Sequence, residues 1–363
     1  MTATAPAAPA AATTGAREAA DEAAFATSGH TGEPVTWRRP RDLLDYEAAL
    51  VADTLIGPVD YIINFAPVHH MYGHLFGEIL PRLRGAEVHQ AWHRDPTDVP
   101  PLREGARTLL VCLPSSWPLL RHLVPALRDL PGVVALHSSA APTDAAREVV
   151  AGLHDRGFRA ESLLGATETG AVAHRPIEPA GAPGTTPWRL LPDVYLVPDR
   201  GDDAGADYLH VASPRIARGP GMSQAPHSWR LTDLIRRRGP RTFDHLGRAS
   251  RLVKVNGRRV WLDHVENAVR GALPGADAAC LPVNDDVRGE HYELYVSAPA
   301  DPAGPGGPPD GARLVRESLT AALPGVPGPR AVRFVPRIPR TDTGKVRLPA
   351  LRCLADQTHA AHA

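Results

Sequence analysis

The stretch DYIINFAP at residues 60–67 sets the fold, because it is a short apolar run bounded by turn residues. A run of this length and composition predicts a buried strand. The following segments alternate in character: HLFGEILPRLRG (74–85) has a helical pattern, TLLVCLP (108–114) reads as a strand, and WPLLRHLVPALRDL (117–130) reads as a helix. Strands that alternate with helices predict an α/β domain with a mainly parallel sheet.

The flanking segments extend this pattern in both directions. YEAALVADTLIG (46–57) predicts a preceding helix, and GVVALHSSAAP (132–142) with TDAAREVVAGLHDRG (143–157) predicts another strand, loop and helix. After about residue 185, short segments such as WRLLPDVYLVP (188–198) are separated by turn residues, which favours a β-rich subdomain. Residues 25–246 are therefore expected to form one large N-terminal domain.

A second, small α+β domain is expected over residues 247–363, where hairpin, helix and strand patterns succeed one another. Its expected elements are a hairpin at 251–262, helices at 264–273 and 312–323, and strands at 278–286, 292–300 and 331–340. Residues 1–24 are rich in Ala, Thr and Pro and lack the basic start and apolar run of a secretory signal. We expect them to be a disordered leader.

Composition narrows the classes of function. Forty Lys and Arg balance forty Asp and Glu, which argues against nucleic acid or an anionic membrane surface as the main partner. No stretch approaches the roughly 20 apolar residues that span a bilayer. Cys112, Cys280 and Cys353 are widely spaced, so neither a disulfide framework nor a metal site is predicted, and a reducing cytoplasm is expected.

Lysine occurs only at positions 254 and 345, so the other 38 basic side chains are arginine. Together with 38 prolines and abundant Ala and Gly, this usage indicates a GC-rich bacterial genome. A chain that uses arginine wherever a cation suffices is expected to keep lysine where a compact ammonium on a flexible stem is needed. Lys345 lies in a second, independent pattern, which makes it the stronger candidate.

Four polar segments suit the chemistry of a nucleoside triphosphate. TSGHTG (27–32) offers hydroxyls and glycine amides to phosphate oxygens, although no Gly-Lys-Ser/Thr of a Walker loop follows. LLGATETG (163–170) places Thr167 and Glu168 after an apolar strand, where a carboxylate suits a phosphate-bound Mg²⁺. Taken alone, these two segments are also compatible with an ordinary loop and a solvated glutamate.

The other two segments lie further along the chain. Asp233 in SWRLTDLI (228–235) suits ribose hydroxyls, and Lys345 in PRTDTGKVRL (339–348) suits the charge of a pentavalent phosphate. Taken alone, the first pattern favours a turn aspartate and the second a surface lysine.

Taken together and in this order, these segments resemble the adenylate-forming superfamily of acyl- and aryl-CoA synthetases, luciferases and nonribosomal peptide adenylation domains. PVHHMYG (67–73) resembles its acyl-pocket motif, SSAAP (138–142) its Gly-rich acyl and adenine segment, and residues 247–266 its hinge and the start of a mobile C-terminal domain. The resemblance runs from Phe25 to Leu348.

The resemblance implies a role for each matching residue. Lys345 would bridge the acid and the α-phosphate, Glu168 would bind Mg²⁺, and Thr167 would bind a phosphate. The implied ATP contacts are Thr27, Ser28, Gly29, Thr31 and Gly32 for the phosphates, Asp233 and Arg248 for the ribose, and Arg259 near phosphate. The implied acyl-pocket residues are His70, Tyr72, Ser139 and Ala140, and Gly257 would border the thiol tunnel.

Several positions depart from the family pattern. Val35 stands where lysine is usual, Leu164 where a tyrosine stacks on adenine, and Ser250 where the hinge carries Asp or Lys. About 26 residues precede the phosphate loop, whereas family members carry more than about a hundred. A shortened N-terminal region of this kind would leave a face open, which favours a homodimer.

The leading hypothesis is ATP-dependent activation of a small aryl or acyl acid to acyl-AMP with release of pyrophosphate. The acyl group would then pass to the thiol of CoA or of a carrier protein's phosphopantetheine, or to an amine or nitrite. A non-catalytic nucleotide-binding or scaffold subunit is the alternative, favoured by Leu164, Val35 and the short N-terminus. A P-loop kinase or NTPase is disfavoured by the missing Walker lysine. A compact bacterial ligase fits secondary metabolism.

Overall fold

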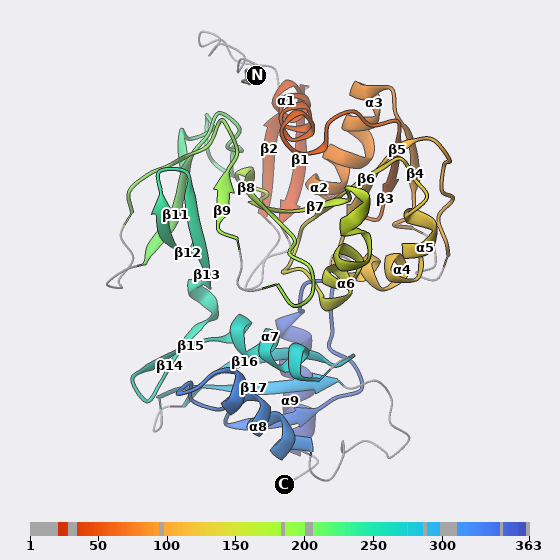
Figure 1. Ribbon diagram of the computed structural model, residues 1–363. Coiled ribbons are helices and arrows are strands. Elements are labelled where there is room, and N and C mark those ends of the chain that lie inside the picture. Colours follow the sequence, from red (N-terminus) through yellow and green to blue (C-terminus); the bar gives the residue numbers. More distant parts are fainter. Residues whose placement is uncertain are drawn as a thin grey trace. The chain divides into compact units, whose positions relative to one another are not determined.

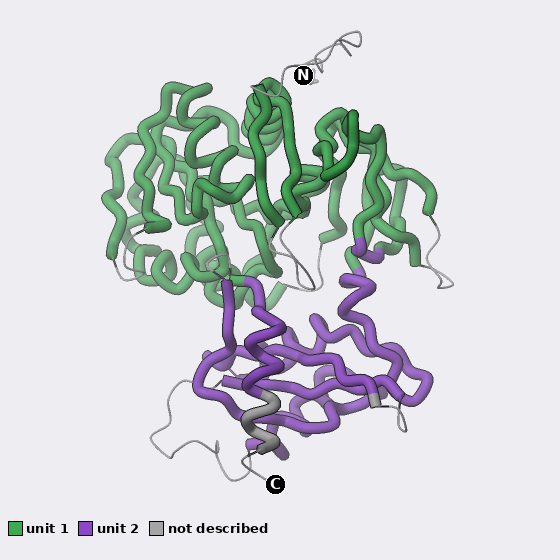
Figure 2. The backbone as a smooth tube through the Cα atoms, turned by 180° about the vertical axis from the view of Figure 1, so that it is seen from behind, with its two compact units in different colours: residues 1–231, 235–245, 342–344 green, residues 232–234, 246–341, 345–363 purple. Residues whose placement is uncertain are grey.

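The computed structural model describes most of the 363-residue chain. The described residues are 21–27, 35–93, 98–182, 186–199, 206–273, 275–285, 289–297, 311–341 and 344–360. The chain divides into two compact units, shown in Figure 2. Unit 1 contains residues 1–231, 235–245 and 342–344, and unit 2 contains residues 232–234, 246–341 and 345–363.

Unit 1 begins with a hairpin and helices around parallel strands. Its first elements are β1 (Glu22–Thr27), β2 (Val35–Pro40), α1 (Arg41–Val51), β3 (Tyr61–Asn64), α2 (Met71–His74), α3 (Leu80–Arg84), β4 (Glu87–Gln90), β5 (Arg107–Cys112), α4 (Trp117–His122), α5 (Val124–Leu127), β6 (Gly132–His137) and α6 (Asp144–Leu153). The strands that follow are β7 (Arg159–Ala166), β8 (Gly170–Pro176), β9 (Trp188–Leu190), β10 (Tyr195–Leu196), β11 (Asp207–Ala212), β12 (Ser228–Gly239) and β13 (Thr242–Arg248).

The strands β1 and β2 form a separate hairpin, and a mixed sheet contains the strands from β3 to β13. Within the described residues its order is β10-β11-β12-β13-β9-β8-β7-β6-β5-β3-β4. The strands from β4 to β7 pair in parallel, whereas β8 turns back antiparallel to β7 and β9 continues antiparallel to β8. The predicted α/β class with a parallel sheet followed by a β-rich part is thus confirmed.

Successive side chains of the parallel strands pack alternately into two separate hydrophobic cores, one on each face of the sheet. Ile62 of β3 packs into the core that contains Leu44 of α1 and Leu80 of α3. Its neighbours Tyr61 and Ile63 pack into the core on the opposite face, with the helices α4 and α6. Strands buried on both faces read as continuous apolar runs, and helices cover both faces of the parallel part of the sheet, as Figure 1 shows.

Two details differ from the sequence-based expectation. The predicted helix over 117–130 is divided into α4 and α5, because Pro125 lies at the start of α5 and lacks the N–H that would continue α4. The strand β4 was not predicted, since its sequence EVHQ is mostly polar. It is one edge strand of the sheet, and among the described residues it pairs with β3 alone.

Unit 2 is built on a small sheet with helices on both faces. Its elements are β14 (Leu252–Val255), β15 (Arg258–Trp261), α7 (Leu262–Ala272), β16 (Asp277–Asp285), β17 (Gly289–Ser297), α8 (Gly311–Ala322), β18 (Ala331–Phe334) and α9 (Leu348–Ala360). The strands β16, β17 and β18 form the sheet, with β17 in the centre.

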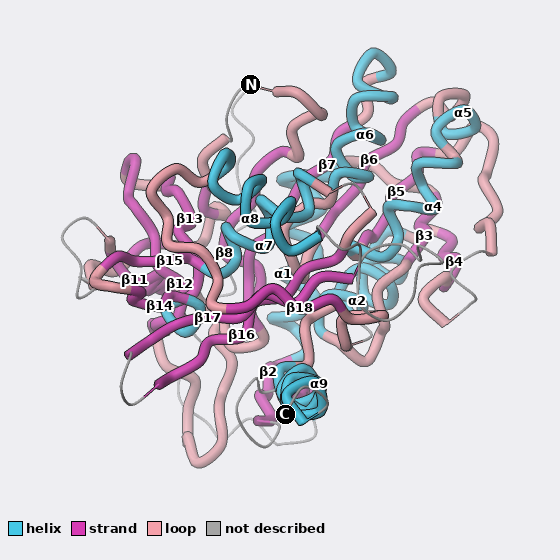
Figure 3. Tube along the Cα trace, turned by 90° about the horizontal axis from the view of Figure 1, so that it is seen from below, coloured by secondary structure: helices cyan, strands magenta, loops and turns pink. Residues whose placement is uncertain are grey.

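The two faces of this sheet carry different helices. Cys280 and Leu294 pack in one core with residues of α7 and α8, while Tyr295 packs in another with Leu351 of α9. Figure 3 shows α7 and α8 on one side of the strands and α9 on the other. The helix α9 was not predicted, and the predicted strand over 331–340 ends at Phe334. No helix in the described part of the chain is long and apolar enough to cross a membrane.

Candidate active site

The predicted phosphate loop joins the antiparallel strands β1 and β2. Their pairing ends with Thr27 opposite Val35, and the Thr27 hydroxyl donates to the Val35 carbonyl at 3.2 Å. Thr27 therefore lies where the loop leaves the hairpin. The predicted phosphate contacts Ser28, Gly29, Thr31 and Gly32 fall within residues 28–34, outside the described residues. Their role stays a prediction.

Thr167 and Glu168 lie in the tight turn between β7 and β8, and both are half-buried. The Glu168 carbonyl accepts a hydrogen bond from the amide of Ala217 at 2.7 Å, which holds the turn. No group of three His, Cys, Asp or Glu side chains among the described residues could hold a metal by itself. Mg²⁺ commonly binds through one or two carboxylates plus substrate phosphates. Glu168 therefore fits an ion that arrives with the nucleotide.

A group of buried charges supports this turn through the start of β8. We call it the Glu47 cluster; its members are Arg39, Glu47, Asp193 and Arg215. Glu47 of α1 accepts from Arg39 at 2.6 Å, lies 3.1 Å from Arg215, and accepts from the amide of Ala171 at 2.7 Å. Arg215 in turn donates to both carboxylate oxygens of Asp193 at 2.7 and 2.9 Å. The cluster thus joins β2, α1 and the start of β8.

Three of the four charges of this cluster are fully removed from water, since Arg39, Glu47 and Arg215 are each 0% exposed. Burial alone would raise the pKa of Glu47, but the two guanidinium groups and the Ala171 amide lower it below its ordinary 4.5. A depressed carboxyl pKa gives stability that is complete above the unfolded value and is lost as the pH falls through the folded value. Glu47 therefore stabilises the fold at neutral pH.

His137 ends β6 and supports the predicted acyl segment Ser138–Pro142. The indole N–H of Trp117 donates to Nδ1 of His137 at 3.0 Å, and Nε2 lies 2.9 Å from the Ala140 carbonyl. These partners require a proton on Nε2 alone. Burial lowers the pKa of His137 to about 4, which keeps the ring neutral. Ser139 adopts a φ of 81°, a strained value for a residue with a side chain.

The motif PVHHMYG (67–73) folds back tightly on itself before α2. A Cβ on Gly73 would lie 2.2 Å from the Pro67 carbonyl oxygen, so only glycine fits there. His70 is half-buried directly before α2, and its ring lies 4.4 Å from that of the exposed His69. The Tyr72 ring packs on Phe76, and burial raises the pKa of the Tyr72 hydroxyl. The structure places Tyr72 inward, while its role and that of His70 in an acyl pocket stay predictions.

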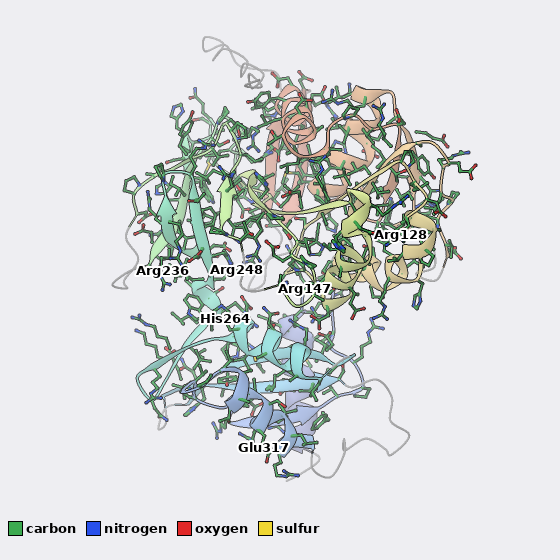
Figure 4. All side chains as sticks on the ribbon, in the orientation of Figure 1. Arg128, Arg147, Arg236, Arg248, His264 and Glu317 are labelled. Carbon is green, nitrogen blue, oxygen red and sulfur yellow. The ribbon has the colours of Figure 1, made fainter. Side chains whose placement is uncertain are left out.

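The two residues predicted to bind ribose lie together. Asp233 on β12 is 7% exposed, and its carboxylate lies 3.7 Å from Nε of Arg248 at the end of β13. The strands β12 and β13 are neighbours in the sheet, which explains how positions 15 residues apart meet. Figure 4 labels Arg248 at the end of its strand. An acceptor beside a donor is the arrangement that a ribose diol requires.

The predicted thiol-tunnel glycine lies in a two-residue hairpin turn of unit 2. Asn256 and Gly257 have φ values of 51° and 75° and join β14 to β15. Positive φ at both positions defines the turn that an Asn-Gly pair favours. Arg259 lies next to this turn, opposite Lys254, and both side chains are exposed. Lys345 is half-buried in the loop between β18 and α9.

No family model matches the chain. Individual relatives do match it and show its family. The 4-coumarate–CoA ligase of Rhodobacter capsulatus is 32% identical over 342 residues, which cover 92% of this chain and 76% of the relative. The phenyloxazoline synthase MbtB of Mycobacterium tuberculosis is 33% identical over 216 residues, which cover 52% of this chain and 14% of the relative.

A solved structure shares the fold. The anthranilate CoA ligase AuaEII in complex with anthranoyl-AMP has a TM-score of 0.68 and 17% identity, covering 93% of this chain and 68% of that one. The identity of 32% across nearly the whole chain decides the family. The chain belongs to the adenylate-forming superfamily. The membership in this superfamily that the sequence predicted is thereby confirmed.

The structure describes three residues at which the chain departs from the superfamily pattern. Leu164, where the adenine-stacking tyrosine is usual, is half-buried and packs against the core of unit 1. Val35 is 38% exposed at the start of β2. Ser250 lies in the helical turn Ala249–Arg251 that begins unit 2. Leu164 replaces a flat aromatic surface with an aliphatic one, so weaker contact with adenine is expected.

Sequence reasoning missed the Glu47 cluster and His137, although both support predicted site segments of the superfamily. Arg39, Glu47 and Arg215 read as ordinary charged residues, since partners this far apart in sequence leave no local pattern. His137 ends the apolar run GVVALH, directly before the predicted acyl segment SSAAP. A polar histidine at the end of an apolar strand, next to a predicted site segment, was the sequence feature that could have identified it.

Replacing Glu47 with glutamine should destabilise unit 1 by about 3 to 5 kcal/mol, because the buried Arg39 would lose its counter-charge and Arg215 would keep only that of Asp193. Urea denaturation followed by circular dichroism measures this loss. Glu148, which pairs with Arg121 at 3.1 Å on the surface, provides the matched control, and E148Q should cost less than about 0.5 kcal/mol. Equal, small losses in E47Q and E148Q would contradict the role of the cluster.

The neutral His137 should make the folding stability depend on pH in a range above the one in which Glu47 titrates. The unfolded chain takes up a proton near 6.5 and the folded chain only near about 4, so folding stability decreases as the pH falls between these values. This difference between the unfolded and folded pKa of His137 corresponds to roughly 3 kcal/mol of folding stability. The stability difference between wild type and H137Q, measured in urea at pH 7, 5.5 and 4, should shrink by that amount. A difference that does not change with pH would contradict a neutral, buried His137.

Proposed function

We propose that the protein activates a small aryl or acyl carboxylic acid with Mg·ATP to give acyl-AMP and pyrophosphate, and then transfers the acyl group to a thiol. The observation that carries this proposal is the 32% identity to a 4-coumarate–CoA ligase over 92% of the chain. The name of that relative and that of the anthranilate CoA ligase favour an aryl acid.

In the first step, a carboxylate oxygen attacks the α-phosphorus of ATP while the bond from that phosphorus to the bridging oxygen of pyrophosphate breaks. The Lys345 ammonium neutralises charge on the pentavalent phosphate, and Asp233 with Arg248 orients the ribose. Glu168 would hold Mg²⁺, which supplies charge neutralisation on the phosphate oxygens when bound. Catalysis consists of positioning and charge stabilisation, with no covalent enzyme intermediate.

In the second step, a thiol sulfur attacks the acyl carbon, and AMP leaves. Coenzyme A is the favoured acceptor, because similarity to the CoA ligase covers 92% of the chain, whereas similarity to the synthase MbtB covers 52%. A carrier protein's phosphopantetheine offers the same thiol chemistry. Gly257 would border the path of the thiol, and the space beside it is open, since a Cβ there would meet nothing within 4 Å.

Acid-dependent exchange of pyrophosphate into ATP tests the first step without a thiol. We expect exchange with at least one acid from a panel of 4-coumarate, anthranilate, benzoate and malonate. K345A should lower the exchange rate at least about 100-fold, because the loss falls on the transition state, and should leave the KM for ATP nearly unchanged.

The chain supplies its own matched control, since its other lysine, Lys254, is exposed on β14. K254A should exchange pyrophosphate at the wild-type rate. Thermal stabilisation by Mg·ATP without exchange for any acid would contradict the proposal and favour a non-catalytic binding subunit. The acid with the highest rate would name the substrate class.

A further inference from the structure

The loop that carries Lys345 is closed by its own hydrogen bonds. The Thr341 amide donates to the Lys345 carbonyl at 2.8 Å, and the Lys345 amide donates to the Thr341 hydroxyl at 3.1 Å. The Arg347 amide donates to the Pro339 carbonyl at 2.9 Å. Lys345 is therefore fixed to Thr341, the residue directly after Arg340.

Arg340 fastens the base of this loop to the sheet of unit 2. Its Nε and Nη2 donate to the two carboxylate oxygens of Asp277 at 2.7 and 2.6 Å. Such a two-pronged contact fixes orientation as well as distance, which a single ammonium contact does not. Burial would raise the pKa of Asp277, but the hydrogen bonds from Arg340 lower it overall, so the carboxylate is charged at neutral pH.

Asp277 is itself held from the side of α7. Arg270 donates to the Ala278 carbonyl at 2.8 Å and lies 3.4 Å from Asp277 and 3.3 Å from Glu266. Glu266 also accepts from the Cys280 amide at 2.7 Å and pairs with Arg251 in the first turn of unit 2. A continuous line of ion pairs thus runs from the start of unit 2 to the lysine loop.

We propose that Arg340 and Asp277 are the positioning residues of Lys345, and that they set the place from which its ammonium reaches the α-phosphate. This inference rests on the proposed function of Lys345. The lysine side chain is a flexible stem, so the place of its backbone decides where the ammonium is most often found. A displacement of about 1 Å at a catalytic group costs on the order of 100-fold in rate.

R340Q removes the two-pronged contact, and Arg333 supplies a matched control. Arg333 makes the same kind of contact to Glu293, at 3.1 and 3.2 Å, in the same unit. In acid-dependent pyrophosphate exchange, R340Q should lower kcat about 10- to 100-fold with the KM for ATP within about twofold. R333Q should leave kcat unchanged. A kcat of R340Q within twofold of wild type, or an equal loss in R333Q, would overturn the inference.

Two further variants separate positioning from a general structural role. Since Arg340 acts through Lys345, the double variant R340Q/K345A should exchange no more slowly than K345A alone. R340K keeps a cation beside Asp277 without the two-pronged contact, so it should lose less rate than R340Q. Additive losses in the double variant, or a loss in R340K as large as that in R340Q, would contradict the proposal.

Hydrogen exchange provides a readout that does not depend on catalysis. R340Q should accelerate amide exchange at Thr341 and Lys345 and leave the amides of β17 unchanged, and R333Q should not affect the loop. If wild type shows no pyrophosphate exchange with any acid, the proposed function fails while this measurement still decides the positioning role. Unchanged protection of both loop amides in R340Q would overturn that role.

Discussion

The ion pair between Glu47 and its two arginines is the constraint on which unit 1 depends. Glu47, Arg39 and Arg215 are completely buried, and removal of any one would leave an uncompensated charge in the interior. The cluster explains why glycine stands at position 170, since a Cβ there would lie 2.4 Å from a Glu47 oxygen. Through it, the strand that follows the predicted phosphate loop and the turn that carries Glu168 share one support.

Ion pairs also hold segments of unit 2 in place, although these pairs are partly exposed. There the line from Arg251 to Arg340 joins the first turn of the unit to the loop of Lys345. Partly exposed pairs add little to stability, but a two-pronged guanidinium contact fixes geometry. In each unit, arginine thus holds a segment that carries a predicted site residue.

Much of the fold could be predicted from sequence because strands and helices alternate with clear apolar patterns. The parallel strands β3, β5 and β6 are buried on both faces and appear as continuous apolar runs, whereas the polar edge strand β4 does not. The meeting of Asp233 and Arg248 was implied by family resemblance, and the strand pairing explains it. The Asn256-Gly257 turn follows from its sequence.

The supports of the site could not be predicted in the same way. The partners of Glu47 lie 8 and 168 residues away in the chain, and a glutamate in an amphipathic helix ordinarily faces water. His137 forms its bonds with Trp117 and Ala140 only once β6 lies beside α4. Both depend on tertiary packing, which local patterns do not encode.

The direct test of the central claim follows the oxygen atoms of the acid. The protein is supplied with Mg·ATP, CoA and an acid whose carboxylate carries ¹⁸O, and the nucleotide products are analysed by mass spectrometry. Formation of acyl-AMP followed by thiol transfer predicts AMP that contains one ¹⁸O atom from the acid. Unlabelled AMP, or ADP as the product, would contradict activation through an acyl-adenylate.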